Sequence, residues 1–132
     1  MIPKFRAWDK VLKEMVQVNA LVLDEQVVKV TYKNGNVAKE DMKEYELMQS
    51  TGLKDKNGKE IFEGDIITNF IDRADVKNHQ TLGFFTVLNG REYFFASGIS
   101  IDDFEEDAEE FSEAVEIIGN IYENPELLEV EE

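Results

Sequence analysis

Short stretches of β-branched and alternating apolar residues dominate the first half of the chain, and polar turn residues separate them. Residues 4–8 alternate charged and apolar side chains, which is typical of an edge strand. Residues 14–23 and 27–32 are rich in Val, Leu and Met and predict two further strands, with a turn at residues 9–13 before them. Asn34-Gly35 then predicts a type I′ hairpin turn, because both residues tolerate a positive φ angle.

Residues 37–48 fit a helix or a strand equally well, and a polar stretch follows at residues 51–60. Its Asp55-x-Asn57-Gly58 segment superficially resembles a calcium loop, but the EF-hand spacing fails, so we predict a tight turn. We place a boundary here, between a β-rich N-terminal subdomain (1–50) and a second subdomain (51–132).

The second subdomain also reads as mainly β. Gly64-Asp65 predicts a turn between two apolar pairs, with the Asp side chain capping it. Residues 72–80 are polar and predict a loop. Strands near 61–71, 82–88, 91–97 and 115–122 are what a small, partly open barrel needs.

The clearest local signal is a hairpin centred on Asn89-Gly90. A two-residue loop fixes the register and places Phe85 opposite Phe94 and Phe84 opposite Phe95. Both faces of the hairpin therefore carry aromatic side chains. One face is expected to fill a core. The other must be covered by the acidic segment that follows, by the N-terminal subdomain or by another copy of the chain.

Residues 101–111 predict a short, acidic, amphipathic helix. Ser100 is a good N-cap, and the apolar residues Phe104, Ala108, Phe111 and Val115 follow at helical spacing. The opposite face is almost entirely carboxylate, so packing of the phenylalanines must hold the helix against charge repulsion. A strand near residues 115–122 follows this helix, and Asn124-Pro125 then predicts the start of a second short helix that ends at Leu128.

The charge is distributed very unevenly. The whole chain has a formal net charge of −15 at pH 7, whereas residues 1–50 carry no net charge and residues 102–132 hold 14 acidic residues and no basic one. Such a segment repels DNA and anionic bilayers, because affinity for phosphate comes from Lys and Arg. We therefore expect no direct nucleic-acid partner and no membrane partner, whereas a basic protein would be attracted. A solvated acidic face is the simpler interpretation.

No catalytic constellation is recognisable. The chain has no cysteine, and its one histidine, His79, lies in a polar stretch without an obvious serine partner. Phosphate-binding glycine motifs and the HExxH zinc motif do not occur. The carboxylates of Asp102, Asp103, Glu106 and Asp107 would bind Ca²⁺ or Mg²⁺ weakly, because no loop shapes them into a site. We predict no catalytic residue, no cofactor and no metal site.

Three blocks of the sequence resemble the YopX family: Phe5–Asp9, Leu47–Ile66 and Ile118–Leu128. The resemblance implies a small protein of a phage or prophage of Gram-positive bacteria, of unknown function, whose later part is an SH3-like β-barrel. It supplies no catalytic residue. Because no apolar run is long enough to span a membrane and no signal peptide is recognisable, we expect a cytoplasmic location in the host cell.

These observations favour a non-enzymatic interaction module that self-associates into a homo-oligomer. An acidic DNA mimic or decoy, which occupies a basic nucleic-acid-binding protein of the host, is the alternative, and a weak metal-dependent enzyme is the second alternative. The side chains expected to carry an interaction lie on one hairpin face and on the acidic helix: Phe84, Phe95 and Arg91, and Glu105, Glu106 and Glu109.

Overall fold

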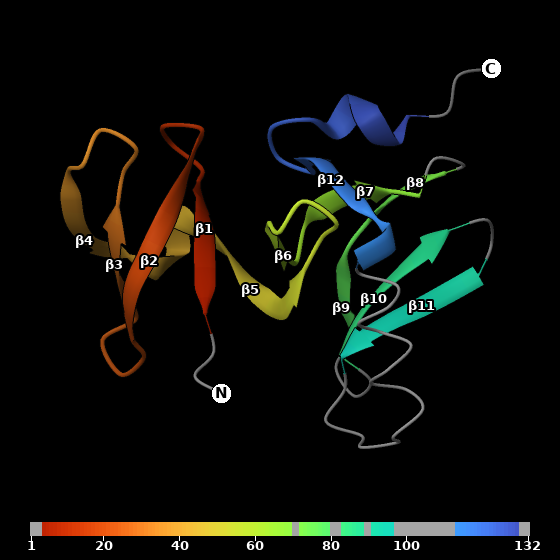
Figure 1. Cartoon of the computed structure of the whole chain (residues 1–132). Helices are drawn as coiled ribbons and strands as arrows, with labels where there is room; N and C mark the ends of the chain where they lie inside the picture. Colours follow the sequence, from red (N-terminus) through yellow and green to blue (C-terminus); the bar gives the residue numbers. More distant parts are fainter. Residues whose placement is uncertain (1–3, 70–71, 80–82, 89–90, 97–112, 130–132) are drawn as a thin grey trace. The chain divides into compact units, whose positions relative to one another are not determined.

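The chain is built mainly from antiparallel β-strands, as the sequence predicted (Figure 1). A computed structural model describes residues 4–69, 72–79, 83–88, 91–96 and 113–129. The chain divides into two compact units, Met1–Gln49 and Ser50–Glu132. The division follows Gln49, one residue before the boundary expected from composition and turn signals.

The N-terminal unit is one antiparallel sheet with strand order β4-β3-β2-β1-β5. Its elements are β1 (Phe5–Asp9), β2 (Glu14–Val22), β3 (Val27–Thr31), β4 (Val37–Asp41), the 3-10 turn η1 (Met42–Glu44) and β5 (Tyr45–Lys54). β1 pairs with β2 on one side and with β5 on the other. The edge position predicted for residues 4–8 is therefore wrong, because an alternating pattern reports which face is buried and not how many neighbours a strand has.

One face of this sheet forms the core of the unit. The buried residues that pack together on this face are Ala7, Val16, Val28, Val30 and Tyr45. Along β3 the buried valines alternate with the exposed Lys29, as a strand with one solvated face requires. Each buried valine contributes about 1.5–3 kcal/mol relative to an exposed one, so burial of this face explains why the sheet forms.

The loop between β3 and β4 is longer than predicted. The strands are hydrogen-bonded up to the pair Thr31 and Val37, and the Gly35 N–H donates to the Tyr32 carbonyl at 2.9 Å. Within residues 32–36 only Gly35 has a positive φ angle, at 89°. The hairpin is therefore confirmed, whereas the two-residue type I′ turn is wrong, since that turn needs a positive φ at two successive residues.

The described residues of the C-terminal unit form two three-stranded antiparallel sheets, with orders β12-β7-β8 and β11-β10-β9. β5 continues into this unit, where it pairs with β6 (Glu60–Phe62). The remaining elements are β7 (Asp65–Thr68), β8 (Arg73–Asp75), β9 (Lys77–His79), β10 (Gly83–Leu88), β11 (Arg91–Ala96), β12 (Glu116–Asn120) and the 3-10 helix η2 (Pro125–Leu128).

The described strands of this unit form open sheets and not the expected SH3-like barrel. A barrel needs one continuous ladder that closes on itself. Here the chain leaves β8 at Val76 and enters β9, and the two strands pair with different sheets. The predicted loop over residues 72–80 is also wrong, since both strands lie within it. The buried Ala74 and Val76 were too few apolar residues to outweigh the polar composition.

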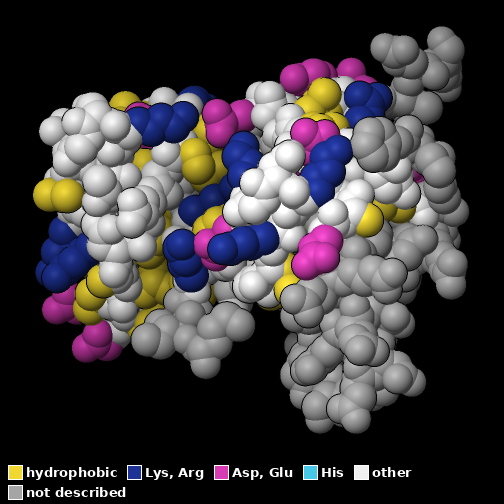
Figure 2. Space-filling model, viewed as in Figure 1, with side chains coloured by type: hydrophobic (Ala, Val, Ile, Leu, Met, Phe, Trp, Pro, Cys, Tyr) yellow, Lys and Arg dark blue, Asp and Glu magenta, His cyan; other side chains and the backbone are white. Residues whose placement is uncertain are grey.

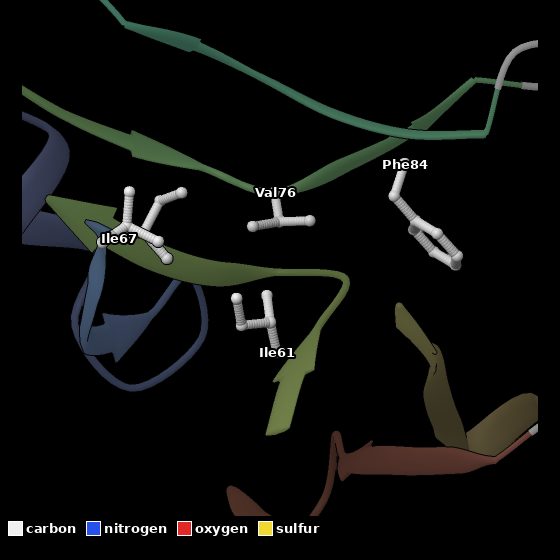
Figure 3. Close-up of a cluster of buried hydrophobic side chains, with 5 residues drawn as sticks. Ile61, Ile67, Val76 and Phe84 are labelled. Atoms are coloured by element: carbon white, nitrogen blue, oxygen red, sulfur yellow. The ribbon is translucent and has the colours of Figure 1, made fainter. Parts of the chain in front are cut away.

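The core of the C-terminal unit gathers side chains from several of these strands (Figure 3). The side chains that point toward one another are Ile61 of β6, Ile67 of β7, Phe84 of β10, and Val76, which lies between β8 and β9. Val115 completes the cluster. The Gly64-Asp65 turn that leads into β7 is confirmed. Gly64 has a φ of 88°, and the Asp65 side chain accepts the Phe62 N–H at 2.7 Å.

The predicted hairpin of β10 and β11 is confirmed, and Phe85 pairs with Phe94. A bulge beyond this pair shifts the register, so Phe84 lies opposite Ala96 and not opposite Phe95. A turn fixes the register only as far as the ladder stays regular. The acidic helix predicted near residues 101–111 lies outside the described residues.

The C-terminal elements follow the prediction closely. β12 ends at Asn120, and η2 begins at Pro125 and ends at Leu128. The Asn124 side chain, however, does not cap η2 and instead accepts the Asn120 N–H at 3.2 Å.

Candidate functional site

A buried carboxylate organises the turn between β1 and β2. Asp9 is only 4% exposed, and its Oδ1 accepts the backbone N–H groups of Val11 at 2.9 Å and Leu12 at 3.0 Å. The Lys13 N–H donates to the Asp9 carbonyl at 2.9 Å. The turn is thus fixed from within, while Val11 and Leu12 are held outward with exposed fractions of 68% and 63%.

Two tyrosines extend this network. The Tyr32 hydroxyl donates to Asp9 Oδ2 at 2.8 Å and lies 2.6 Å from the Tyr45 hydroxyl. An ionised carboxylate only accepts, and Tyr32 has a single proton to donate, so Tyr45 must donate to Tyr32. The hydrogen bonds therefore run in one direction, from Tyr45 through Tyr32 to Asp9.

The pKa values of Asp9, Tyr32 and Tyr45 agree with this direction of hydrogen bonding. Burial alone would raise the pKa of Asp9, but the N–H groups of the turn and the Tyr32 hydroxyl outweigh it and hold the pKa below 3.8. Burial, and then the hydrogen bonds to Tyr45 and Asp9, raise the pKa of Tyr32 well above 10.0. Burial also raises the pKa of Tyr45. At neutral pH Asp9 is therefore charged and both tyrosines are neutral, and the network holds the turn.

A pocket of about 240 Å³ lies beside this network. It is lined by Asp9, Val11, Leu12, Tyr32, Glu40, Glu44 and Tyr45. No Lys or Arg is among these lining residues. Lys10 is held by other groups, because its Nζ donates to the Lys43 carbonyl at 3.0 Å and lies 3.2 Å from Glu46. Glu40 and Glu44 form no ion pair within the part of the chain that the structure describes. The pocket is therefore negative, with an apolar edge.

A second buried carboxylate organises the loop between β5 and β6. Asp55 is 3% exposed, and its Oδ1 accepts the N–H groups of Asn57 and Lys59, both at 2.9 Å. Its Oδ2 accepts the Ile117 N–H of β12 at 3.0 Å. Burial would raise the pKa of Asp55, but these N–H groups outweigh it and hold the pKa below 3.8. The predicted tight turn is confirmed, and Asp55 also joins it to β12.

Exposed lysines surround this turn. Lys54, Lys56 and Lys59 are all exposed, and two of them, with Gly52, Leu53, Asp55, Gly58 and Glu113, line a pocket of about 600 Å³. The Lys56 Nζ lies 3.6 Å from Glu116. Because the charge of Asp55 is buried, the exposed charges of the turn itself are those of its lysines, and Glu113 and Glu116 lie beside them.

The comparisons with known proteins agree with the resemblance. The family model described as YopX protein matches residues 4–129, which is nearly the whole chain. This protein belongs to the YopX family. The crystal structure of protein EF1440 from Enterococcus faecalis is similar, with 33% sequence identity, a TM-score of 0.53, and coverage of 98% of this chain and 99% of that chain. No curated protein matches the chain.

Among the residues expected to carry an interaction in this YopX protein, the structure describes the side-chain surroundings of Phe84 alone. Phe84 is 9% exposed and packs in the core of the C-terminal unit. Arg91 and Phe95 lie on β11, where Arg91 pairs with Leu88. The acidic residues Glu105, Glu106 and Glu109 lie outside the described residues. His79 ends β9 and therefore does not lie in a loop.

The sequence signals behind the two networks were partly readable. Two of the blocks that resemble the YopX family contain Asp9 and Asp55, each directly before a predicted turn, which is where Asp commonly accepts backbone N–H groups. Tyr32 and Tyr45 gave no such signal, because Tyr32 follows β3 and Tyr45 begins β5, and they meet Asp9 only through the sheet. Their role was missed.

Two further searches concern metals and membranes. No group of three or more His, Asp or Glu that could hold a metal ion occurs among the described residues. The metal candidates Asp102, Asp103, Glu106 and Asp107 fall outside that part of the chain. No helix in the described ranges is long and apolar enough to cross a bilayer.

Proposed function

We propose that this YopX-family protein is a non-enzymatic interaction module that self-associates, and that the turn between β1 and β2 is its docking surface. The observation that carries this proposal is the outward position of Val11 and Leu12, fixed by the Asp9 hydrogen bonds. Turn tips normally carry small or polar residues. Two adjacent branched apolar side chains on a rigid tip are well suited to insert into a partner surface.

Rigidity matters here because ordering a loop on binding costs free energy. A tip whose conformation is already fixed avoids that cost, so more of the buried apolar area appears as affinity. Single exposed apolar residues are common and need no explanation. The β1–β2 tip differs in that its two apolar side chains border the acidic pocket and are positioned by a buried hydrogen-bond network.

The states of the two buried carboxylates support a non-enzymatic role. A general base near neutral pH needs a pKa close to that pH and a free lone pair directed at substrate. Asp9 and Asp55 have pKa values lowered below 3.8, and each accepts three hydrogen bonds from the protein. Both carboxylates therefore stabilise the fold.

Sedimentation velocity of the full chain over a wide concentration range tests the proposal. We expect a mass above that of the monomer, and we expect the Val11→Ser/Leu12→Ser variant to shift the equilibrium toward monomer. The matched control is Leu23→Ser/Val37→Ser, because these side chains are 72% and 74% exposed in the same unit but lie outside the pocket.

The control should associate like the wild type. A wild-type chain that stays monomeric throughout contradicts self-association. Equal weakening in both variants contradicts the assignment to the β1–β2 turn, since it would reflect general surface hydrophobicity.

The decoy function is the second candidate, and the exposure of the C-terminal acidic residues favours it. In the described part of residues 102–132, Glu113, Glu123, Glu126 and Glu129 are all exposed. A DNA mimic would present such carboxylates to a basic groove of a host protein. Capture of host proteins on the immobilised chain, with elution by duplex DNA, tests this function. Recovery of no DNA-binding protein would end it.

A further inference from the structure

Self-association of this chain has to overcome its own charge. With a net charge of −15, two copies repel each other at long range. A specific contact between copies therefore gains from a place where opposite charges meet. The two units supply such a pair of surfaces: the acidic pocket of the N-terminal unit and the lysine-bearing turn of the C-terminal unit.

The basic surface is preorganised. Asp55 fixes the backbone between Lys54 and Lys59 through its bonds to Asn57 and Lys59. Lys56 is drawn toward Glu116, whereas Lys54 and Lys59 form no ion pair within 4.0 Å in the described ranges, although the charge of Lys59 acts on the buried Asp55. Figure 2 shows Lys and Arg side chains gathered over the region of β5 and β6. Two lysines are thus presented to solvent from a fixed turn.

The acidic surface complements both parts of a lysine side chain, the aliphatic stem and the ammonium group. The exposed Glu40 and Glu44 add two charges to that of Asp9 at the pocket. Val11 and Leu12 form an apolar edge beside them. A lysine buries its aliphatic stem on apolar surface while its ammonium group seeks carboxylates or water. The same pocket therefore offers a place for the stem and for the charge.

We propose that the occupant of the acidic pocket is the Lys54–Lys59 turn of a second copy of this chain. This inference rests on the proposed function and names the partner of the same surface. The contact joins two different patches, so a two-fold dimer contains it twice. If the two copies do not close into such a dimer, the same contact repeats from copy to copy and builds an open chain of subunits.

Charge reversal on the full chain tests the proposal. The pocket variant is Glu40→Lys/Glu44→Lys, and the turn variant is Lys54→Glu/Lys59→Glu. All four side chains are exposed, so both variants should fold, which circular dichroism checks. We expect each variant alone to associate roughly tenfold or more weakly than the wild type at low salt, because attraction becomes repulsion.

The decisive measurement is the one-to-one mixture of the two variants. The reversed pocket of one variant then meets the reversed turn of the other, and the unreversed turn meets the unreversed pocket. We expect the mixture to regain association close to that of the wild type, although each variant alone does not. No general change in net charge produces this pattern.

Matched controls change the same charge elsewhere. Glu126→Lys/Glu129→Lys matches the pocket variant, and Lys29→Glu/Lys33→Glu matches the turn variant; all four residues are exposed. Each control has the same net charge as the variant that it matches, so long-range repulsion is equal in the two, and the control should associate much more strongly than that variant. If wild type and the Val11/Leu12 variant behave as expected but the mixture stays dissociated, the occupant is wrong and the proposed function stands. If the wild type is monomeric, both fail.

Discussion

The Tyr32 hydroxyl donates to Asp9 at 2.8 Å and connects the end of one strand to the end of another in the N-terminal unit. Asp9 thereby has three donors, two from the turn that it caps and one from the sheet. The exposed tip of the proposed docking surface is thus tied to the core through a single carboxylate. Changes at Tyr32 should reach the tip, although Tyr32 is not part of the turn.

Replacing Tyr32 by Phe should destabilise the N-terminal unit by about 1–3 kcal/mol, because a buried carboxylate oxygen loses its donor and the Tyr45 hydroxyl loses its acceptor. Tyr45→Phe should cost less, about 0.5–1.5 kcal/mol, since the bond between Tyr32 and Asp9 remains. Urea unfolding followed by fluorescence measures both. The only tryptophan, Trp8, is 8% exposed and lies beside Asp9 on β1. A larger loss of stability for Tyr45→Phe than for Tyr32→Phe would contradict the direction of the hydrogen bonds from Tyr45 through Tyr32 to Asp9.

The Asp55→Asn variant should lose about 1–3 kcal/mol of stability at neutral pH, because the amide cannot accept all three N–H bonds and presents its own N–H₂ to donors. Burial opposes ionisation of Asp55, but its bonds lower the folded pKa below the unfolded value of 3.8. Its stabilising contribution is therefore fully present above pH 3.8 and is lost as the pH falls through the folded pKa.

The difference in unfolding free energy between wild type and Asp55→Asn should accordingly be largest near neutral pH and shrink below pH 3.8. Urea unfolding followed by circular dichroism across this range measures it. The exposed Asp24→Asn is the control and should change little at any pH. A difference between Asp55→Asn and wild type that grows toward acid would show that Asp55 is not ionised in the fold.

Local patterns predicted the elements that local chemistry decides. The turns at Asp9, Asp55 and Gly64 follow from residues that accept or permit special backbone geometry, and their predictions are confirmed. The strand from Val27 follows from its run of β-branched residues. In each case the deciding interactions lie within a few residues of each other.

Pairing between distant strands was not readable in the same way. The interior position of β1, the bulge beside Phe84 and the two strands that flank Val76 depend on partners far away in the sequence. The candidate site shares this property. Asp9 could be recognised as a turn residue, but its meeting with Tyr32 and Tyr45 depends on the sheet order.

Shortening the side chain of Ile67 should cost far more stability than the same change at an exposed position of the C-terminal unit. Ile67→Ala should cost about 2–5 kcal/mol and Ile67→Val about 0.5–1.5 kcal/mol, because the side chain is fully buried and a cavity adds to the lost apolar transfer. Thermal unfolding of both variants measures the ratio. The exposed Val87→Ala on β10 is the control and should stay within about 0.5 kcal/mol of wild type. Similar costs at both positions would contradict the assignment of the core.

Gly119 should not tolerate a side chain, because a Cβ at this position would lie 2.5 Å from Asn124 Oδ1 and 3.0 Å from Asn124 Cβ. Gly119→Ala should therefore destabilise the chain by about 1–3 kcal/mol and displace the Asn124 side chain from the Asn120 N–H. Thermal unfolding measures this cost. Asn124→Ala alone should lose about 1 kcal/mol with that hydrogen bond.

The double variant decides whether the clash is the cause. In the Asn124→Ala background the two nearest atoms are gone, so Gly119→Ala should cost at most about half of what it costs in the wild type. The remaining cost comes from the Asn124 Cβ, which Ala retains. An equal cost in both backgrounds would place the constraint in the backbone of β12, where the ladder is irregular between Ile117 and Gly119. Partial recovery instead identifies a close approach between β12 and the residue that precedes η2.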